Sequence, residues 1–150
     1  MIKTFKGLLQ DDEQNHIRLS TTDGKMGYRI TKFTGIPYAP LTLDQENVLK
    51  IYKTKQSTVD GVVDFGDDSL LAVCCIKYND DAAASFGNPQ HVIFDQEIFN
   101  QDIYITHEDV HAGSRGCNYY IELEQIKLTE QEALVAIVKD LREERDGAQI

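Results

Sequence analysis

Alternating apolar and polar positions dominate the first 128 residues of the chain. Apolar residues two positions apart, such as Tyr28 and Ile30, point to one side of an extended chain, and the polar residues between them point to the other. The pattern predicts about eight short strands separated by turn-forming segments. We expect these strands within residues 2–9, 16–20, 28–31, 49–52, 70–78, 92–94, 103–105 and 119–123. The spacing predicts an all-β domain over residues 1–128, an antiparallel β-sandwich of the jelly-roll kind.

Two segments refine this prediction. Residues 70–78, "LLAVCCIKY", are apolar on both faces and therefore predict a central strand. Asp23-Gly24 lies just before the strand at Tyr28, and this dipeptide is typical of a tight β-hairpin turn. We therefore expect a hairpin at this position.

Near the end of the chain the apolar residues no longer alternate with polar ones but recur every three or four positions, which is the spacing of a helix. Thr129 followed by Glu132 is a capping box, which indicates the start of a helix. The apolar stripe of this helix consists of Leu134, Ile137, Val138 and Leu141. We expect a helix from about residue 130 to 145, within the segment 129–146. Its apolar stripe must be covered either by the same domain or by a neighbouring subunit.

His107-Glu108-Asp109-Val110-His111 matches the H-E-x-x-H pattern of zinc peptidases. The pattern binds zinc on a helix, where the two imidazoles share one side, and a third ligand completes the site. Here an alternating "DIYIT" precedes the match, "AGSRGC" follows it, and no histidine follows His111. We therefore interpret the match as coincidental, expect a polar hairpin loop with both histidines solvated, and expect no metal, cofactor or catalytic residue.

Charge and composition exclude several other functions. The 25 acidic and 15 basic residues give a net charge of -10, which disfavours nucleic acid and anionic lipid as partners. The sequence has no apolar stretch long enough for a signal peptide or a membrane span, so we expect a soluble, unprocessed protein.

Cys74, Cys75 and Cys117 lack the spacing of a disulfide framework. No nucleophile signature surrounds Cys117, Ser114 or Ser69, and the acidic loops lack a calcium motif.

Exposed aromatic and apolar side chains favour a protein that assembles. The rings of Tyr119 and Tyr120 point to opposite faces of a strand, so one of them is exposed unless a partner covers it. The residues predicted to form subunit contacts are Phe99, Tyr104, the exposed ring of the pair Tyr119 and Tyr120, Leu134 and Leu141. The alternative is a carbohydrate-binding module whose loop carboxylates and tyrosines grip a glycan.

Four segments resemble a pattern found in small virion structural proteins of marine tailed phages: "GYRITKF", "ENVLKIYKT", "HVIFDQEIFNQDIYIT" and "CNYYIELEQIKLTEQEA". The resemblance implies a non-enzymatic virion component, made in the host cytoplasm and present in many symmetric copies. A capsid decoration or cement subunit is the first expectation, with copies of itself and the major capsid protein as partners. A tail or neck adaptor, or a tail-associated ring protein, is the alternative.

Overall fold

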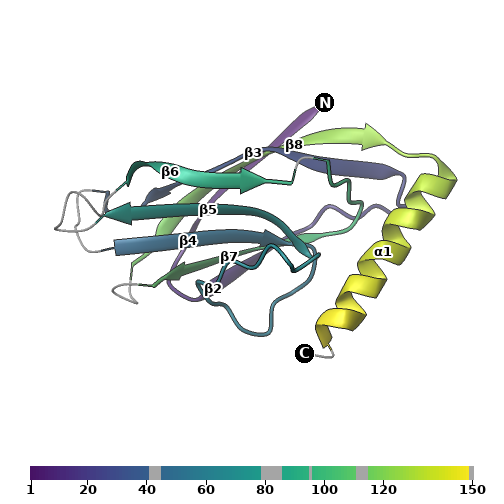
Figure 1. The fold of residues 1–150 in the computed structure, drawn as a ribbon. Coiled ribbons are helices and arrows are strands. Elements are labelled where there is room, and N and C mark those ends of the chain that lie inside the picture. The colour runs from purple at the N-terminus through teal and green to yellow at the C-terminus, as the bar shows by residue number, and fades with distance from the viewer. Residues whose placement is uncertain (41–44, 79–85, 95, 111–114, 149–150) are drawn as a thin grey trace.

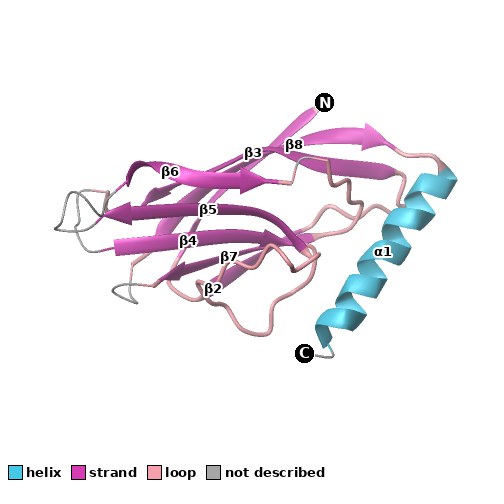
Figure 2. Cartoon of the chain, in the orientation of Figure 1, coloured by secondary structure: helices cyan, strands magenta, loops and turns pink. Residues whose placement is uncertain are grey.

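The chain folds into two antiparallel β-sheets and one C-terminal helix, so the all-β, sandwich-like fold class predicted from the sequence is confirmed (Figures 1 and 2). The structure is a computed structural model, and it describes residues 1–40, 45–78, 86–94, 96–110 and 115–148. In this part of the chain no helix is long and apolar enough to cross a membrane.

The two sheets differ in width. The smaller sheet has the strand order β1-β8-β3 and contains β1 (Ile2–Leu9), β8 (Cys117–Lys127) and β3 (Met26–Pro37). The larger sheet has the order β2-β7-β4-β5-β6 and contains β2 (Glu13–Ile17), β7 (Ile103–Asp109), β4 (Gln45–Tyr52), β5 (Leu70–Tyr78) and β6 (Phe86–Ile93). The sequence predicted β5 as the central strand. It is an interior strand, but β4 occupies the middle of the larger sheet.

The chain passes from one sheet to the other at several connections, which corrects two predicted hairpins. Asp23-Gly24 does form a turn, in which Gly24 N–H donates to the carbonyl of Thr21 and Gly24 adopts a φ of 67°. However, β2 pairs with β7, and β3 pairs with β8, so the turn connects strands of different sheets. The same holds for β7 and β8, which were expected to form a hairpin. Turn chemistry predicts a local bend but does not choose the strand's partner.

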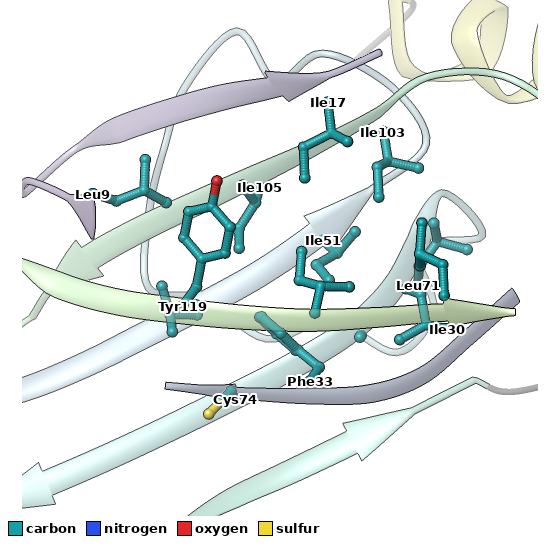
Figure 3. Packing of buried hydrophobic residues seen from close by; sticks show 14 of the residues in the cluster. Leu9, Ile17, Ile30, Phe33, Ile51, Leu71, Cys74, Ile103, Ile105 and Tyr119 are labelled. Atoms are coloured by element: carbon teal, nitrogen blue, oxygen red, sulfur yellow. The ribbon is translucent and has the colours of Figure 1, made fainter. Parts of the chain in front are cut away.

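The main hydrophobic core lies between the two sheets (Figure 3). Both sheets contribute large apolar side chains to it, among them Leu9, Ile30, Phe33, Ile51, Leu71, Ile103, Ile105 and Ile121. Each such side chain contributes about 1.5–3 kcal/mol when it leaves water. The alternation in the sequence is therefore explained by burial of one face of each strand against the opposite sheet.

A second, smaller cluster lies on the other face of the larger sheet. It contains Tyr52, Leu70 and Val73, and Val73 points away from the main core because its neighbours Ala72 and Cys74 belong to that core. The segment 53–69 covers this face. The ring of Phe65 in this segment meets Phe94 edge-on, with 5.4 Å between the ring centroids.

A buried lysine attaches the segment 53–69 to the sheet. The side chain of Lys50 in β4 is only 2% exposed, and its Nζ donates to Asp60 Oδ1 at 2.9 Å and to the Val62 carbonyl at 2.7 Å. Burial lowers the pKa of Lys50, but contacts with Tyr52 and Asp60 more than offset this, and the pKa of Lys50 is raised. The segment therefore supplies the oxygen atoms that a buried ammonium requires.

Helix α1 (Glu130–Ala148) begins where the sequence predicted. Glu132 N–H donates to Thr129 Oγ1 at 3.2 Å, as the capping box requires. In Figure 1 the helix follows the end of β8 and stands beside one end of the sandwich. It is thus attached to the body along one side.

Candidate functional site

Helix α1 contacts the body through a line of small and polar residues. Ala133 and Asp140 are buried against the body. The fully buried Asn100 donates through its side-chain amide to the carbonyl of Ala133 at 3.1 Å and to the carbonyl of Gly24 at 2.9 Å. A side chain at Gly24 would meet Asn100 and Ile137 at 3.1 Å each, so the turn, Asn100 and the helix are tightly packed there.

The apolar stripe of α1 points mainly away from the body. Leu134, Val135, Val138 and Leu141 are 62%, 66%, 45% and 59% exposed. Of the stripe predicted from the sequence, Ile137 is the half-buried member, on the side that faces the turn at Gly24. We call the set Leu134, Val135, Val138 and Leu141 the outer stripe. Such a contiguous apolar surface is typical of an interaction site.

Glu97 joins α1 to the larger sheet. Its Oε1 lies 2.5 Å from Nζ of Lys53, which follows β4, and 2.6 Å from Nζ of Lys139 on the helix. Burial raises the pKa of Glu97, but the two ammonium groups outweigh this and hold the pKa below its usual value. The Lys53 side chain is only 1% exposed, so its charge is compensated inside the protein. These residues lie far apart in the sequence, and no motif predicted their meeting.

A pocket of about 230 Å³ lies between α1 and the larger sheet. Its walls are formed by Lys53, Gln101, Asp102, Tyr104, Ile137, Asp140 and Leu141. It combines an ammonium group, two carboxylates, an amide and an aromatic ring with aliphatic helix residues. This mixture is typical of sites that bind polar groups attached to an apolar body.

Asp102 at the rim of this pocket accepts three hydrogen bonds. Its Oδ1 accepts from the backbone N–H groups of Leu19 and Ser20 at 2.7 and 2.8 Å, and its Oδ2 lies 2.6 Å from Nε2 of His16. Burial raises the pKa of Asp102, but these hydrogen bonds outweigh it and bring the pKa to about 2. The His16 ring stacks on Tyr104 with centroids 4.7 Å apart. The carboxylate therefore fixes the path of the chain between β2 and β3.

The six residues predicted as subunit contacts occupy different places. Phe99 and Tyr119 are 1% and 6% exposed and belong to the chain's own core, so neither offers a surface to a partner. Tyr120 is the outward ring of its pair, half-buried, with its hydroxyl donating to Glu122 at 2.7 Å. Tyr104 is half-buried in the pocket wall. The remaining two, Leu134 and Leu141, lie on the outer stripe.

The H-E-x-x-H match begins on a strand instead of a helix. His107 lies in β7 and is fully buried, which corrects the expectation of a solvated histidine. Its Nδ1 lies 3.0 Å from the carbonyl oxygen of Gln10, and its Nε2 lies 2.8 Å from Oδ1 of Asn47. Burial lowers the pKa of His107 despite the nearby carboxylates of Asp11 and Asp109. Both ring nitrogens are thus engaged by protein atoms, and His111 lies outside the described residues.

Glu108 lies on the opposite face of β7 from His107, in an acidic environment. One of its oxygens, Oε2, is buried and has no hydrogen-bond partner. Burial raises the pKa of Glu108, and the carboxylates of Asp12, Asp11 and Asp60 raise it further, while Lys50 lowers it. Adjacent strand residues point to opposite faces, so His107 and Glu108 cannot converge on one metal.

The other candidate chemical groups are also separated or inert. Among the residues that the structure describes, no three His, Cys, Asp or Glu side chains are grouped so that they could hold a metal ion. Burial raises the pKa of Cys74 and of Cys117 to about 12, so neither thiol is a ready nucleophile. Ser114 lies outside the described residues, and the Ser69 hydroxyl donates to Asp67 at 2.6 Å.

Comparisons with known proteins do not add a family. No family model matches the chain, and no curated protein matches it. Among solved structures, a chain from "Bacillus endospore appendages form a novel family of disulfide-linked pili" is similar at 8% sequence identity and a TM-score of 0.33. The match covers 85% of this chain and 89% of that chain. A similarity at this level carries no argument about function.

Replacing Asp102 by Asn should remove part of the acid dependence of stability. The folded-state pKa of about 2 lies below the ordinary value of 3.8. The ionised Asp102 carboxylate therefore contributes to the free energy of unfolding above pH 3.8, and this contribution is lost as the pH falls toward 2. We expect Asp102→Asn to lower the free energy of unfolding at pH 7 by about 2 kcal/mol and to flatten its decline below pH 4. Denaturant unfolding at a series of pH values measures both effects. An unchanged acid limb would contradict this assignment.

Replacing Glu108 by Gln should stabilise the protein near neutral pH. The pKa of Glu108 is raised above its ordinary value of 4.5, so the folded state favours the neutral acid. Stability from this group is present below pH 4.5 and is lost as the pH rises through the folded-state pKa. We expect Glu108→Gln to raise Tm by a few degrees at pH 7 and by less at pH 4. The exposed Asp68→Asn is the matched control. A lower Tm for Glu108→Gln at pH 7 would show that the charged form is favoured.

Proposed function

We propose that this chain is a non-enzymatic structural protein of a phage particle, and that it acts as a capsid decoration or cement subunit. The observation that carries the proposal is the outer stripe of α1, which leaves four large apolar side chains in solvent. A helix that is held on its body by Ala133, Asn100 and Glu97, yet turns its apolar side outward, is suited to meeting another protein. The resemblance of the sequence to small virion proteins supports the choice of particle.

The proposed mechanism is burial of the outer stripe against a second copy or against another virion protein such as the major capsid protein. Each leucine that becomes fully buried in such a contact contributes about 1.5–3 kcal/mol. Many weak contacts of this kind are multiplied when the subunits form a symmetric array. The net charge of -10 keeps unassembled copies apart.

The alternative within the same class is a tail or neck adaptor, or a tail-associated ring protein. It uses the same outer stripe but differs in symmetry. A six-fold or twelve-fold ring in purified particles would favour the tail or neck, and three-fold or five-fold clusters would favour the capsid.

A second class of function is favoured by the pocket between α1 and the larger sheet. Tyr104 and Gln101 present an aromatic ring and an amide there, a combination that suits the ring face and hydroxyl groups of a glycan. If the chain is a carbohydrate-binding module, a glycan array will show binding that Tyr104→Ala abolishes. Array binding that survives this substitution, or no binding at all, would remove this candidate.

The double variant Leu134→Lys/Leu141→Lys tests the favoured proposal. We expect its association constant with empty capsids to fall at least tenfold, because each lost leucine contact exceeds the ~1.4 kcal/mol that corresponds to a factor of ten. Capsid co-sedimentation measures this affinity. Val62→Lys is the matched control, since Val62 is 64% exposed on the segment 53–69. Equal loss in both variants, or no loss in either, would contradict a role for the outer stripe.

A further inference from the structure

The four sheet edges differ in how well they are protected from pairing with another chain. The edge of β3 is closed at Tyr28, which exchanges two backbone hydrogen bonds with Phe99, and is interrupted by a register shift between Ile30 and Lys32. The edge strand β2 is only five residues long. The edge strand β6 contains Pro89, which lacks an N–H, and its pairing with β5 is irregular. Short strands, bulges and prolines are the usual protections of an edge.

Strand β1 has none of these three protections, although it carries Lys3 and Lys6, and edge lysines are a further usual protection. Its eight residues pair with β8 without a register shift, from Ile2 opposite Glu124 to Leu9 opposite Cys117. It contains no proline, and β8 is its neighbour within the sheet. Ile2 and Leu8 are 56% and 37% exposed. Among the edges described here, β1 is therefore the one best prepared to accept another strand.

The direction of the backbone groups of β1 follows from one hydrogen bond. Gln125 N–H donates to the carbonyl of Met1 at 2.9 Å. In an antiparallel ladder the hydrogen-bonded positions alternate, so the odd-numbered residues of β1 turn their backbone groups toward β8. The even-numbered residues Ile2, Thr4, Lys6 and Leu8 turn their N–H and C=O groups toward the free edge.

We propose that β1 pairs with β1 of a second copy of this chain, antiparallel, about a two-fold axis that passes beside Phe5. In this register Ile2 lies opposite Leu8 of the partner subunit, and Thr4 lies opposite Lys6 of the partner subunit. Both pairs join residues whose backbone groups point outward, so they form the hydrogen-bonded pairs of the new ladder. Phe5 meets Phe5 of the partner subunit at the axis, where the non-hydrogen-bonded geometry brings side chains closest.

Side-chain chemistry selects this register over its neighbours. When one β1 strand slides along the other, only a change of register by two residues keeps the outward-pointing N–H and C=O groups of the two strands opposite each other. A shift in one direction places Lys6 opposite its own copy, where like charges repel. A shift in the other direction places Ile2 opposite the partner subunit's Lys6 and leaves Leu8 without a partner. The register centred on Phe5 instead pairs apolar with apolar residues and separates the lysines.

Charge does not favour this contact, because two chains of net charge -10 repel each other and β1 adds Lys3 and Lys6 of both copies. In the register centred on Phe5, however, no lysine lies directly opposite another lysine, and the contact depends on backbone hydrogen bonds and apolar side chains. Pairing there joins the two three-stranded sheets into one continuous sheet. This inference goes beyond the proposed function, because it names a contact that does not involve α1. Either contact can fail in an experiment without the other.

Two kinds of variant test the pairing. Thr4→Pro removes an N–H that points to the free edge and preserves the hydrogen bonds between β1 and β8, and Thr4→Val is its matched control. Phe5→Cys places two thiols at the axis, where opposed Cα atoms lie about 4.5 Å apart and can form a disulfide. Ile2→Cys is the control, because two copies of Ile2 would lie roughly 20 Å apart in this register. The unchanged chain, oxidised in parallel, measures the background from the natural cysteines.

We expect analytical ultracentrifugation to give about twice the 17.0 kDa of one chain for the unchanged protein and for Thr4→Val. Thr4→Pro should sediment as a folded monomer, with its fold checked by circular dichroism. The dimer should persist in Leu134→Lys/Leu141→Lys, which separates this contact from the outer stripe. Mild oxidation should cross-link Phe5→Cys and leave Ile2→Cys un-cross-linked. A dimer that survives Thr4→Pro, equal cross-linking of the two cysteine variants, or a monomer throughout would overturn the pairing.

Discussion

Two sheets of unequal width share one hydrophobic core, and most other features of the molecule follow from this. The smaller sheet covers the inner face of the larger one, and Leu9, Phe33 and Ile121 from the smaller sheet meet Ile51, Leu71 and Ile105 from the larger one. The outer face of the larger sheet then needs its own cover, which the segment 53–69 provides. The buried ammonium group of Lys50 holds that cover in place through Asp60 and Val62. Helix α1 closes one end through Asn100 and Glu97.

Short-range patterns predicted the elements well, and long-range contacts account for what they missed. Alternation found at least part of each strand but not all of the bounds, since residues 18–20 lie beyond β2 (Glu13–Ile17) and the predicted residues 28–31 and 92–94 cover only parts of β3 and β6. The capping box at Thr129 predicted the start of the helix, because this signal depends on residues close together in the sequence. The turn at Asp23-Gly24 was also real, but its partner strands were chosen by burial of β2 against β7 and of β3 against β8. Phe99 was predicted to form a subunit contact, but its side chain is buried and its backbone pairs with Tyr28. The meeting of Glu97 with Lys53 and Lys139 joins three separate parts of the chain, which no local pattern encodes.

A strand, unlike a helix, separates the neighbouring residues of the H-E-x-x-H match. His107 and Glu108 lie next to each other in a zinc-binding pattern, yet a strand sends them to opposite faces. His107 is buried with both ring nitrogens engaged, and Glu108 is surrounded by other carboxylates. In the described part of the chain, the surfaces open to other molecules include the outer stripe of α1 and the edge strand β1. Both are suited to contacts with other proteins, which supports the proposal of an assembling structural protein.

We propose that the chain completes the burial of its apolar surface by associating with other copies or with a particle. Sedimentation equilibrium of the unmodified protein over a wide concentration range measures this association. We expect an average mass that rises with concentration above the 17.0 kDa of one chain, with the effect persisting at high salt because the contacts are mainly apolar. A mass that stays at 17.0 kDa at every concentration, together with no binding to empty capsids, would contradict it.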